Sequence, residues 1–172
     1  MRRAVLAVGT AAIVLAGCAK SGPPPKRQPG SWSQKIELKR LEGPKADAMR
    51  PRMEQMLAMM SAISLCVTPE MAAKEAPTQD LDKFGGGRDC SFDRKSVAGG
   101  NLDVAGTCKG ADGATKKLTA TGTLGASDQD IDMTVENYDA TGAKQGLMEM
   151  RVHSVRNGEC TAKDMTAPAT AM

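Results

Sequence analysis

The chain has 172 residues, with 23 basic and 20 acidic side chains, one histidine and few aromatic residues. This length suits one domain with short extensions, and a net charge of +3 offers no basic surface of the kind that binds nucleic acid. Because aromatic side chains are scarce, leucine, valine, isoleucine and methionine must supply the hydrophobic core, and we expect that core to be thin.

The first residues predict export. Arg2 and Arg3 precede an apolar run over residues 4–15, which is too short to span a bilayer of about 30 Å and is typical of a signal peptide, residues 1–17. The Leu-Ala-Gly-Cys sequence that ends at Cys18 resembles the bacterial lipobox, in which the cysteine sulfur is acylated. We expect Cys18 to become the lipidated N-terminus; the alternative is an ordinary secretory signal whose cysteine joins a disulfide.

The residues after Cys18 predict where the protein is held. Ala19 resembles the sorting signal of outer-membrane lipoproteins, so we expect a location in the cell envelope, on the periplasmic face of the outer membrane. Contact with the membrane is then through the N-terminal lipid. Residues 18–29 contain three consecutive prolines and predict an extended tether. Removing residues 1–17 leaves 21 basic and 20 acidic side chains, which again predicts no nucleic-acid partner.

A strand and two helices are predicted next. Residues 31–39 alternate Trp32, Ile36 and Leu38 with polar residues, as a half-buried strand does. Residues 50–64 carry apolar residues at helical spacing, with Pro51 suited to the first turn; these are Met53, Met56, Leu57, Met60 and Ile63. We expect this methionine face to cover one side of a sheet. Thr68 and Pro69 predict the N-terminus of a second, short helix.

The segment DCSFDRKSVAGGNLDVAGTC predicts a hairpin with a loop at Ala98, Gly99 and Gly100. That loop would pair Val97 with Asn101 and would place Cys90 opposite Cys108. It would also put Phe92, Leu102 and Val104 on the cysteine face, and would point Asp93, Lys95, Asn101 and Asp103 the other way. With Cys18 assigned to lipid, four cysteines remain for an oxidising compartment. We therefore expect disulfides Cys90–Cys108 and, by elimination, Cys66–Cys160; the alternative, four free or metal-binding thiols, lacks any CxxC spacing.

Period-two alternation continues to Val152 and predicts further antiparallel strands. One face would carry Leu118, Ala120, Gly122 and Leu124, then Ile131, Met133 and Val135, then Met148, Met150 and Val152, with turns at Gly113, at Ser127 and Asp128, and at Thr141 and Gly142. The other face would be polar. The expected fold is mainly β (α+β), a curved antiparallel meander of about six strands with one methionine-rich helix. Residues 30–160 would form a single domain, and residues 161–172 a disordered tail.

Residues with catalytic potential are few. His153 is the only candidate general base, and its polar strand neighbours predict a surface histidine. Asp130 and Asp132 share a strand face, which is ordinary solvation, and residues 85–88 lack the lysine and helix of a phosphate-binding loop. The sequence therefore predicts no catalytic residue, no cofactor and no metal site.

Six short motifs, in their order along the chain, carry a family resemblance. They are Pro29-Gly30-Ser31-Trp32, the methionine-rich helix, Cys66-Val67-Thr68-Pro69, Asp89-Cys90-Ser91-Phe92, Cys108-Lys109-Gly110 and Gly158-Glu159-Cys160. In this order they resemble domain of unknown function 3617, a family of small exported bacterial proteins. The resemblance implies an exported, disulfide-bearing domain. It implies no catalytic residue, because the family carries no established activity.

Three functions fit this sequence. The first is a monomeric, non-enzymatic binding module, in which the apolar face and an adaptable methionine-rich helix admit an acyl chain, an apolar peptide or another envelope protein. The second is a Cu(I) or Ag(I) protein, with thioether ligands from Met53, Met56, Met59 and Met60. The third is a purely structural role in the envelope.

Overall fold

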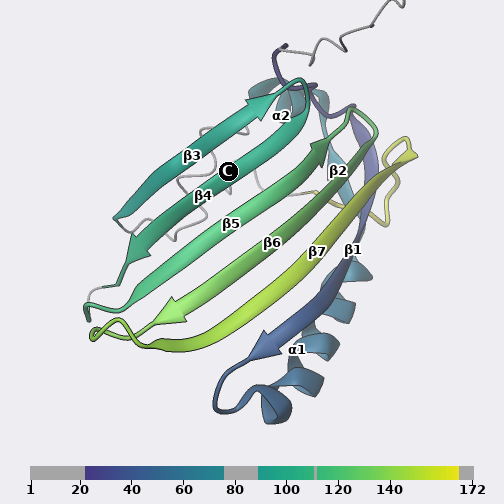
Figure 1. Ribbon diagram of the computed structural model, residues 1–172. Helices are drawn as coiled ribbons and strands as arrows, with labels where there is room; N and C mark the ends of the chain where they lie inside the picture. Colours follow the sequence, from purple (N-terminus) through teal and green to yellow (C-terminus); the bar gives the residue numbers. More distant parts are fainter. Residues whose placement is uncertain (1–21, 76–88, 111, 167–172) are drawn as a thin grey trace, which may run out of the picture.

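The computed structural model describes residues 22–75, 89–110 and 112–166, which form one β-sheet and two helices (Figure 1). In chain order the elements are β1 (Gly30–Glu42), α1 (Ala46–Ser61), β2 (Leu65–Val67), α2 (Pro69–Lys74), β3 (Cys90–Ala98), β4 (Asn101–Lys109), β5 (Thr115–Leu124), β6 (Asp128–Tyr138), β7 (Lys144–Gly158) and β8 (Met165–Thr166). The predicted signal peptide and Cys18 lie outside the described residues.

The sheet has the strand order β3-β4-β5-β6-β7-β1-β2-β8. Strands β3 to β7 form an antiparallel meander, β1 pairs with β7, and the short β2 and β8 pair in parallel at one edge. Figure 1 shows that the sheet is open and strongly twisted. The predicted fold class is confirmed, and its six strands are the six long ones; β2 and β8 are too short to show a period in the sequence.

The hairpin of β3 and β4 confirms the cysteine pairing but corrects the loop. Gly99 and Gly100 alone form the turn, both with positive φ, and Ala98 pairs with Asn101. Glycine adopts this conformation without steric cost, which favours a two-residue turn. The register shifts between Phe92 and Arg94, and this bulge returns Cys90 to its place opposite Cys108.

The same bulge changes one predicted side-chain direction. Lys95 was expected on the polar face, but its Nζ lies 5.3 Å from the centre of the Phe92 ring, on the cysteine side of β3. The reason is that an extra residue in one strand reverses the alternation beyond it. Arg94 takes the polar position instead and pairs with Asp103 on β4, with Nε 3.0 Å from Oδ1.

The first helix begins earlier than predicted, and the second begins where predicted. Helix α1 starts at Ala46, so Pro51 lies inside it rather than in its first turn. Residues 46–50 continue the helix on the N-terminal side, where no apolar period marked it. In α2, Thr68 Oγ1 accepts a hydrogen bond from the Met71 N–H at 3.2 Å and Pro69 is the first helical residue, as expected from the capping pattern.

Helix α1 packs along β1, at the edge of the sheet, rather than across its middle (Figure 1). The Ser61 hydroxyl accepts a hydrogen bond from the Ile36 N–H at 2.9 Å and donates one to the Leu57 carbonyl oxygen at 2.8 Å. Leu57 is the buried side chain of the helix. The predicted cover over the sheet by Met56, Met60 and Ile63 is therefore wrong: all three are exposed, because α1 docks on the part of β1 that has no partner strand on that side.

Buried side chains form two clusters. One lies between β3, β4 and β5 and consists of Val97, Leu102, Val104, Ala120 and Leu124, with Phe92, Ile131 and Met133 packed against it. The other joins Trp32 on β1 to Val67 and Ala72, with Met71 beside them. Within the described ranges, neither helix is long and apolar enough to cross a bilayer.

Residues 161–166, which the sequence placed in a disordered tail, are part of the fold. Met165 donates its backbone N–H to the Ser64 carbonyl oxygen at 2.9 Å, and β8 pairs with β2. Asp164 accepts a hydrogen bond from the Ser31 hydroxyl at 2.8 Å. Residues 167–172 lie outside the described residues.

Candidate functional site

The apolar face of the sheet is continuous across the four strands β5, β6, β7 and β1. The register places Ala120 opposite Met133, Met133 opposite Met150, and Met150 opposite Leu38 on β1. Flanking rows add Leu118, Val135 and Met148 on one side, and Gly122, Ile131, Val152 and Ile36 on the other. Met133, Met150 and most of these neighbours are only half-buried. The alternation predicted from the sequence is therefore confirmed, and it yields an apolar surface that packing covers incompletely.

A second apolar surface lies on α1. We call it the methionine flank: Met49, Met56, Met59 and Met60, with Ile63 just after the helix. Met59 is 67% exposed and Met56 is 50% exposed, whereas Leu57 is 5% exposed. Met53 is half-buried between the two sides. Of the four methionines that the sequence suggested as metal ligands, three thus carry accessible thioethers.

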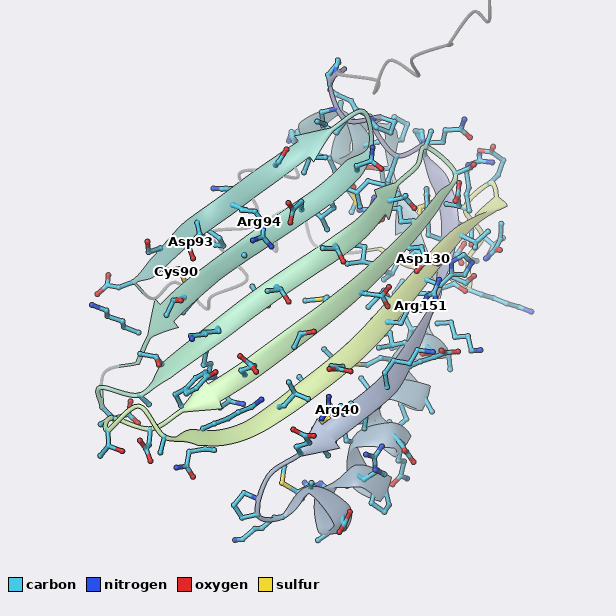
Figure 2. All side chains as sticks on the ribbon, in the orientation of Figure 1. Arg40, Cys90, Asp93, Arg94, Asp130 and Arg151 are labelled. Carbon is cyan, nitrogen blue, oxygen red and sulfur yellow. A yellow bond between two sulfur atoms is a disulfide. The ribbon has the colours of Figure 1, made fainter. Side chains whose placement is uncertain are left out.

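The opposite face of the sheet carries cross-strand ion pairs (Figure 2). Arg151 on β7 binds Asp130 on β6 through two hydrogen bonds, 2.8 Å and 2.5 Å long. Lys144 on β7 lies 2.7 Å from the Glu136 carboxylate on β6. These residues alternate with the apolar ones along the same strands, so the two faces differ sharply in polarity. Paired charges of both signs are typical of a solvated surface.

These pairs lower the pKa of the carboxyl groups. Hydrogen bonds from Lys35 and then Lys39 lower the pKa of Glu37 from 4.5 to about 2. The hydrogen bonds of Arg151 likewise hold the pKa of Asp130 below its ordinary value of 3.8, and those of Lys144 lower the pKa of Glu136. Each lowered pKa reports a nearby cation that favours the ionised carboxylate.

We expect the charged face to lose its stabilising contribution in acid. A carboxyl group whose pKa is lower in the folded chain stabilises the fold above its unfolded pKa, and the contribution is lost as the pH falls through the folded pKa. For Glu37 the contribution is lost as the pH falls from 4.5 to about 2.

Replacing Arg151→Met should raise the pKa of Asp130 toward 3.8, which a carboxyl ¹³C NMR titration measures. Because the pair is solvent-exposed, the melting temperature at neutral pH should change little; an unchanged Asp130 titration would contradict the assignment.

His153 lies on the charged face, beside the pair of Asp130 and Arg151. Its Nδ1 lies 3.7 Å from Asp130 Oδ2, but that carboxylate already binds Arg151. Within residues 22–75, 89–110 and 112–166, no hydroxyl or thiol hydrogen-bonds with His153. The same ranges contain no group of three or more His, Cys, Asp or Glu side chains that could hold a metal ion.

Comparison with known proteins identifies the domain. Residues 27–160 match the family described as Protein of unknown function (DUF3617). This chain belongs to the DUF3617 family. No curated protein and no solved structure matches it. The predicted family is therefore confirmed over nearly the whole described domain, and its description names no function.

In this DUF3617 domain, three separate motifs meet around Trp32. The disulfide Cys66–Cys160 joins β2 to the segment that follows β7. Trp32 is 2% exposed and packs on Val67, which follows Cys66 directly. Gly30 pairs with Val67 and passes so close to β7 that a Cβ atom there would lie 2.1 Å from the Gly158 carbonyl oxygen. The order of these motifs along the chain thus reflects a shared structural cluster.

Residues 22–29, which the sequence assigned to the tether, also lie against this DUF3617 domain. The Gln28 carbonyl oxygen accepts a hydrogen bond from Trp32 Nε1 at 2.9 Å, and the Gln28 N–H donates to the Ala126 carbonyl oxygen at 2.8 Å. Arg27 hydrogen-bonds to Glu75 at the end of α2 and stacks 5.5 Å from the centre of the Trp32 ring. No local sequence signal marks this docking, because its partners are distant in the chain.

The remaining DUF3617 motifs meet at the far end of the hairpin. The disulfide Cys90–Cys108 links β3 to β4, and Cys108 is buried. The Lys109 N–H donates to the Asp89 carbonyl oxygen at 3.0 Å, which extends the pairing by one residue. The two disulfides predicted from the sequence are therefore both present, one at each end of the sheet.

Proposed function

We propose that this DUF3617 domain is a non-enzymatic binding module of the cell envelope, which holds an apolar ligand on the apolar face of its sheet. The observation that supports this function is the continuous apolar row formed by Ala120, Met133 and Met150, in which the two methionines are only half-buried. A large apolar surface that packing leaves partly exposed often marks a binding site, because monomeric soluble proteins rarely expose large apolar patches. An acyl chain or an extended apolar peptide matches the length and the lack of charge of this row.

Methionine suits such a site because its side chain is unbranched and adapts to differently shaped partners. Each methylene group of an acyl chain that leaves water gains about 0.8 kcal/mol. A chain lying across two or three strands therefore gains enough free energy for binding without any polar contact. The proposed occupant is a single acyl chain or an apolar peptide segment, and no residue is assigned a catalytic role.

The double replacement Met133→Gln and Met150→Gln should weaken binding of a fluorescent fatty acid at least tenfold. The amides keep the side-chain length but are costly to desolvate, and about 1.4 kcal/mol corresponds to a factor of ten in affinity. Fluorescence titration measures the change. Met165→Gln is the matched control, because Met165 is 57% exposed and lies on β8, away from the row.

Two results would contradict the ligand site. One is an empty domain in native mass spectrometry after mild extraction, together with no fatty-acid binding by the unaltered chain. The other is equal binding by the unaltered chain and the Met133 and Met150 variant. Thermal unfolding of each variant separates loss of the site from loss of the fold.

The proposal includes a lipid anchor at Cys18 and a location on the periplasmic face of the outer membrane. It is supported by the lipobox-like sequence that ends at Cys18 and by Ala19 after it. Cys18→Ser should abolish metabolic labelling with an alkyne palmitate and leave the chain unprocessed or released from membranes, because no other residue can form the thioether. Unchanged labelling of the variant would exclude the anchor. The domain itself should still fold, since both disulfides use other cysteines.

A Cu(I) or Ag(I) site on α1 is a second candidate function. The observation in its favour is the exposure of Met56, Met59 and Met60, whose spacing puts three soft thioethers within one turn of helix. Titration with Ag(I) should then shift the methyl NMR signals of these methionines at one equivalent. If the methyl signals of Met56, Met59 and Met60 do not shift, α1 does not hold the metal. The methyl signal of Met165 is the control and should stay unchanged in either case.

A further inference from the structure

We propose that the methionine flank of α1 is a membrane-contact surface that enters the headgroup region of an anionic bilayer. This surface is separate from the sheet row assigned to the apolar ligand. Of the six large hydrophobic side chains that are exposed in the described residues, five belong to the flank. Such clustering on one element is the pattern of a surface that meets an apolar or interfacial partner.

The charges of α1 favour an anionic surface over a cationic or neutral one. At 3.6 residues per turn, Lys45, Arg52 and the four methionines fall within about 100° of one another around the helix. Asp47 and Glu54 fall on the opposite side, where Glu54 pairs with Arg50. In the described part of the chain neither Lys45 nor Arg52 has an ion-pair partner. The flank is therefore apolar with basic residues and without a carboxylate, which is the composition of an interfacial helix.

The length of the predicted tether gives an independent argument, which rests on the lipidation proposed above. The Gly99 N–H donates to the Gly22 carbonyl oxygen at 2.8 Å, so the chain is already held to the domain at Gly22, before Gly30. Four residue steps from Cys18 to Gly22 span at most about 14 Å. A lipid at Cys18 would consequently keep the domain against the headgroups, where a short-range surface can act.

The placement of α1 is consistent with that attachment. Leu65, shortly after the helix, pairs with Trp32, and Trp32 binds Gln28 of the docked segment. Met59, Met60 and Ile63 thus lie toward the end of the sheet along which residues 22–29 run, whereas Gly22 itself bonds the β3–β4 turn at the other edge of the sheet. Helix α1 also lies beside and partly behind β1 in Figure 2, at the edge of the sheet, away from the labelled pair of Asp130 and Arg151. A domain turned with this side to the membrane brings the flank to the bilayer.

Methionine oxidation tests the proposal on the full chain. The chain is mixed with vesicles of phosphatidylglycerol and phosphatidylethanolamine, or with vesicles of phosphatidylcholine alone, and treated with hydrogen peroxide. Peptide mass spectrometry then follows sulfoxide at each methionine. We expect oxidation of Met56, Met59 and Met60 to slow at least threefold on the anionic vesicles. Oxidation of Met165, which is exposed on β8, should not change and serves as the internal control.

A matched pair of charge variants separates the flank from general attraction. Lys45→Glu with Arg52→Glu should remove the protection, whereas Lys109→Glu with Lys116→Glu, an equal change of charge at two exposed residues of β4 and β5, should keep it. Equal oxidation with and without anionic vesicles would overturn the proposal and leave the flank to a protein partner or to solvent. The same peptide digest shows whether Cys18 is acylated, and the oxidation of Met133 and Met150 reports on the proposed ligand site. Failure of the anchor or of the ligand site can therefore be distinguished from failure of the flank proposal.

Discussion

Replacing Cys66 and Cys160 together with alanine should lower the melting temperature more than replacing Cys90 and Cys108 together. The two disulfides close loops with sequence separations of 94 and 18 residues. By the chain-entropy relation, the longer loop contributes about 4.7 kcal/mol and the shorter about 3 kcal/mol. The difference corresponds to roughly 4 to 7 °C in melting temperature for a domain of this size.

The structure adds a packing reason for the same order. Cys66–Cys160 fixes the edge strand β2 beside Trp32 and holds the segment that carries Asp164 and β8. Cys90–Cys108 joins two strands that already pair along their whole length. Opening the first bridge therefore frees elements with few other contacts, whereas opening the second leaves a hydrogen-bonded hairpin.

Thermal unfolding of the two double variants, with the unaltered chain in oxidised and reduced form as controls, decides this prediction. Cys108 is buried, so its replacement also removes packing and works against the expected order. A larger loss from the Cys66 and Cys160 variant is thus informative. Equal losses, or a larger loss from the hairpin bridge, would mean that β2 and the C-terminal segment are held by other contacts.

The hairpin shows how far strand register can be predicted from sequence. The prediction placed Cys90 opposite Cys108 from a three-residue loop, and the observed pairing is the same although the loop has two residues. A bulge at Asp93 supplies the missing residue. Neither feature is visible in the alternation alone, because a bulge depends on twist and packing across the whole sheet. The predicted and the observed register agree at Cys90 and Cys108, and they differ only between the bulge and the turn.

The apolar face could be predicted because alternation is a local property of each strand. The place of Met133 and Met150 on that face follows from the period-two alternation alone. The exposure of Met56 and Met59 could not be predicted in this way, since it depends on which surface α1 docks against. That choice involves Ser61 and the N–H of Ile36 on β1, a contact between polar groups that no hydrophobic period records.

The cluster around Trp32 lies beyond sequence reasoning for a different reason. Its members come from residues 27–32, 66–75 and 156–164, which only the finished sheet brings together. Three of the motifs that carry the family resemblance mark these positions without saying what they share. The structure gives the shared cause: each contributes a contact that holds an end of the chain to the edge strands.

Trp32→Ala should destabilise the domain by about 3 to 5 kcal/mol, the usual cost of truncating a buried tryptophan. Trp32 is 2% exposed, packs on Val67 and Ala72, and donates a hydrogen bond to the Gln28 carbonyl oxygen. In a domain with so few aromatic side chains, that loss is a large share of the stability. A drop of more than about 10 °C in melting temperature is expected.

The same variant should release residues 22–29 from the domain. Arg27 stacks on the Trp32 ring and pairs with Glu75, and Lys26 donates to the Ala73 carbonyl oxygen. Without the ring these contacts lose their support, so trypsin should cut after Lys26 and Arg27 much faster than in the unaltered chain, at a temperature where both are folded. Tyr138→Ala is the matched control, because Tyr138 stacks with Lys117 on β5, away from this segment. If trypsin cuts the Trp32 variant and the Tyr138 variant at the same rate, the segment is held by something other than Trp32, and the argument for a short tether loses its structural basis.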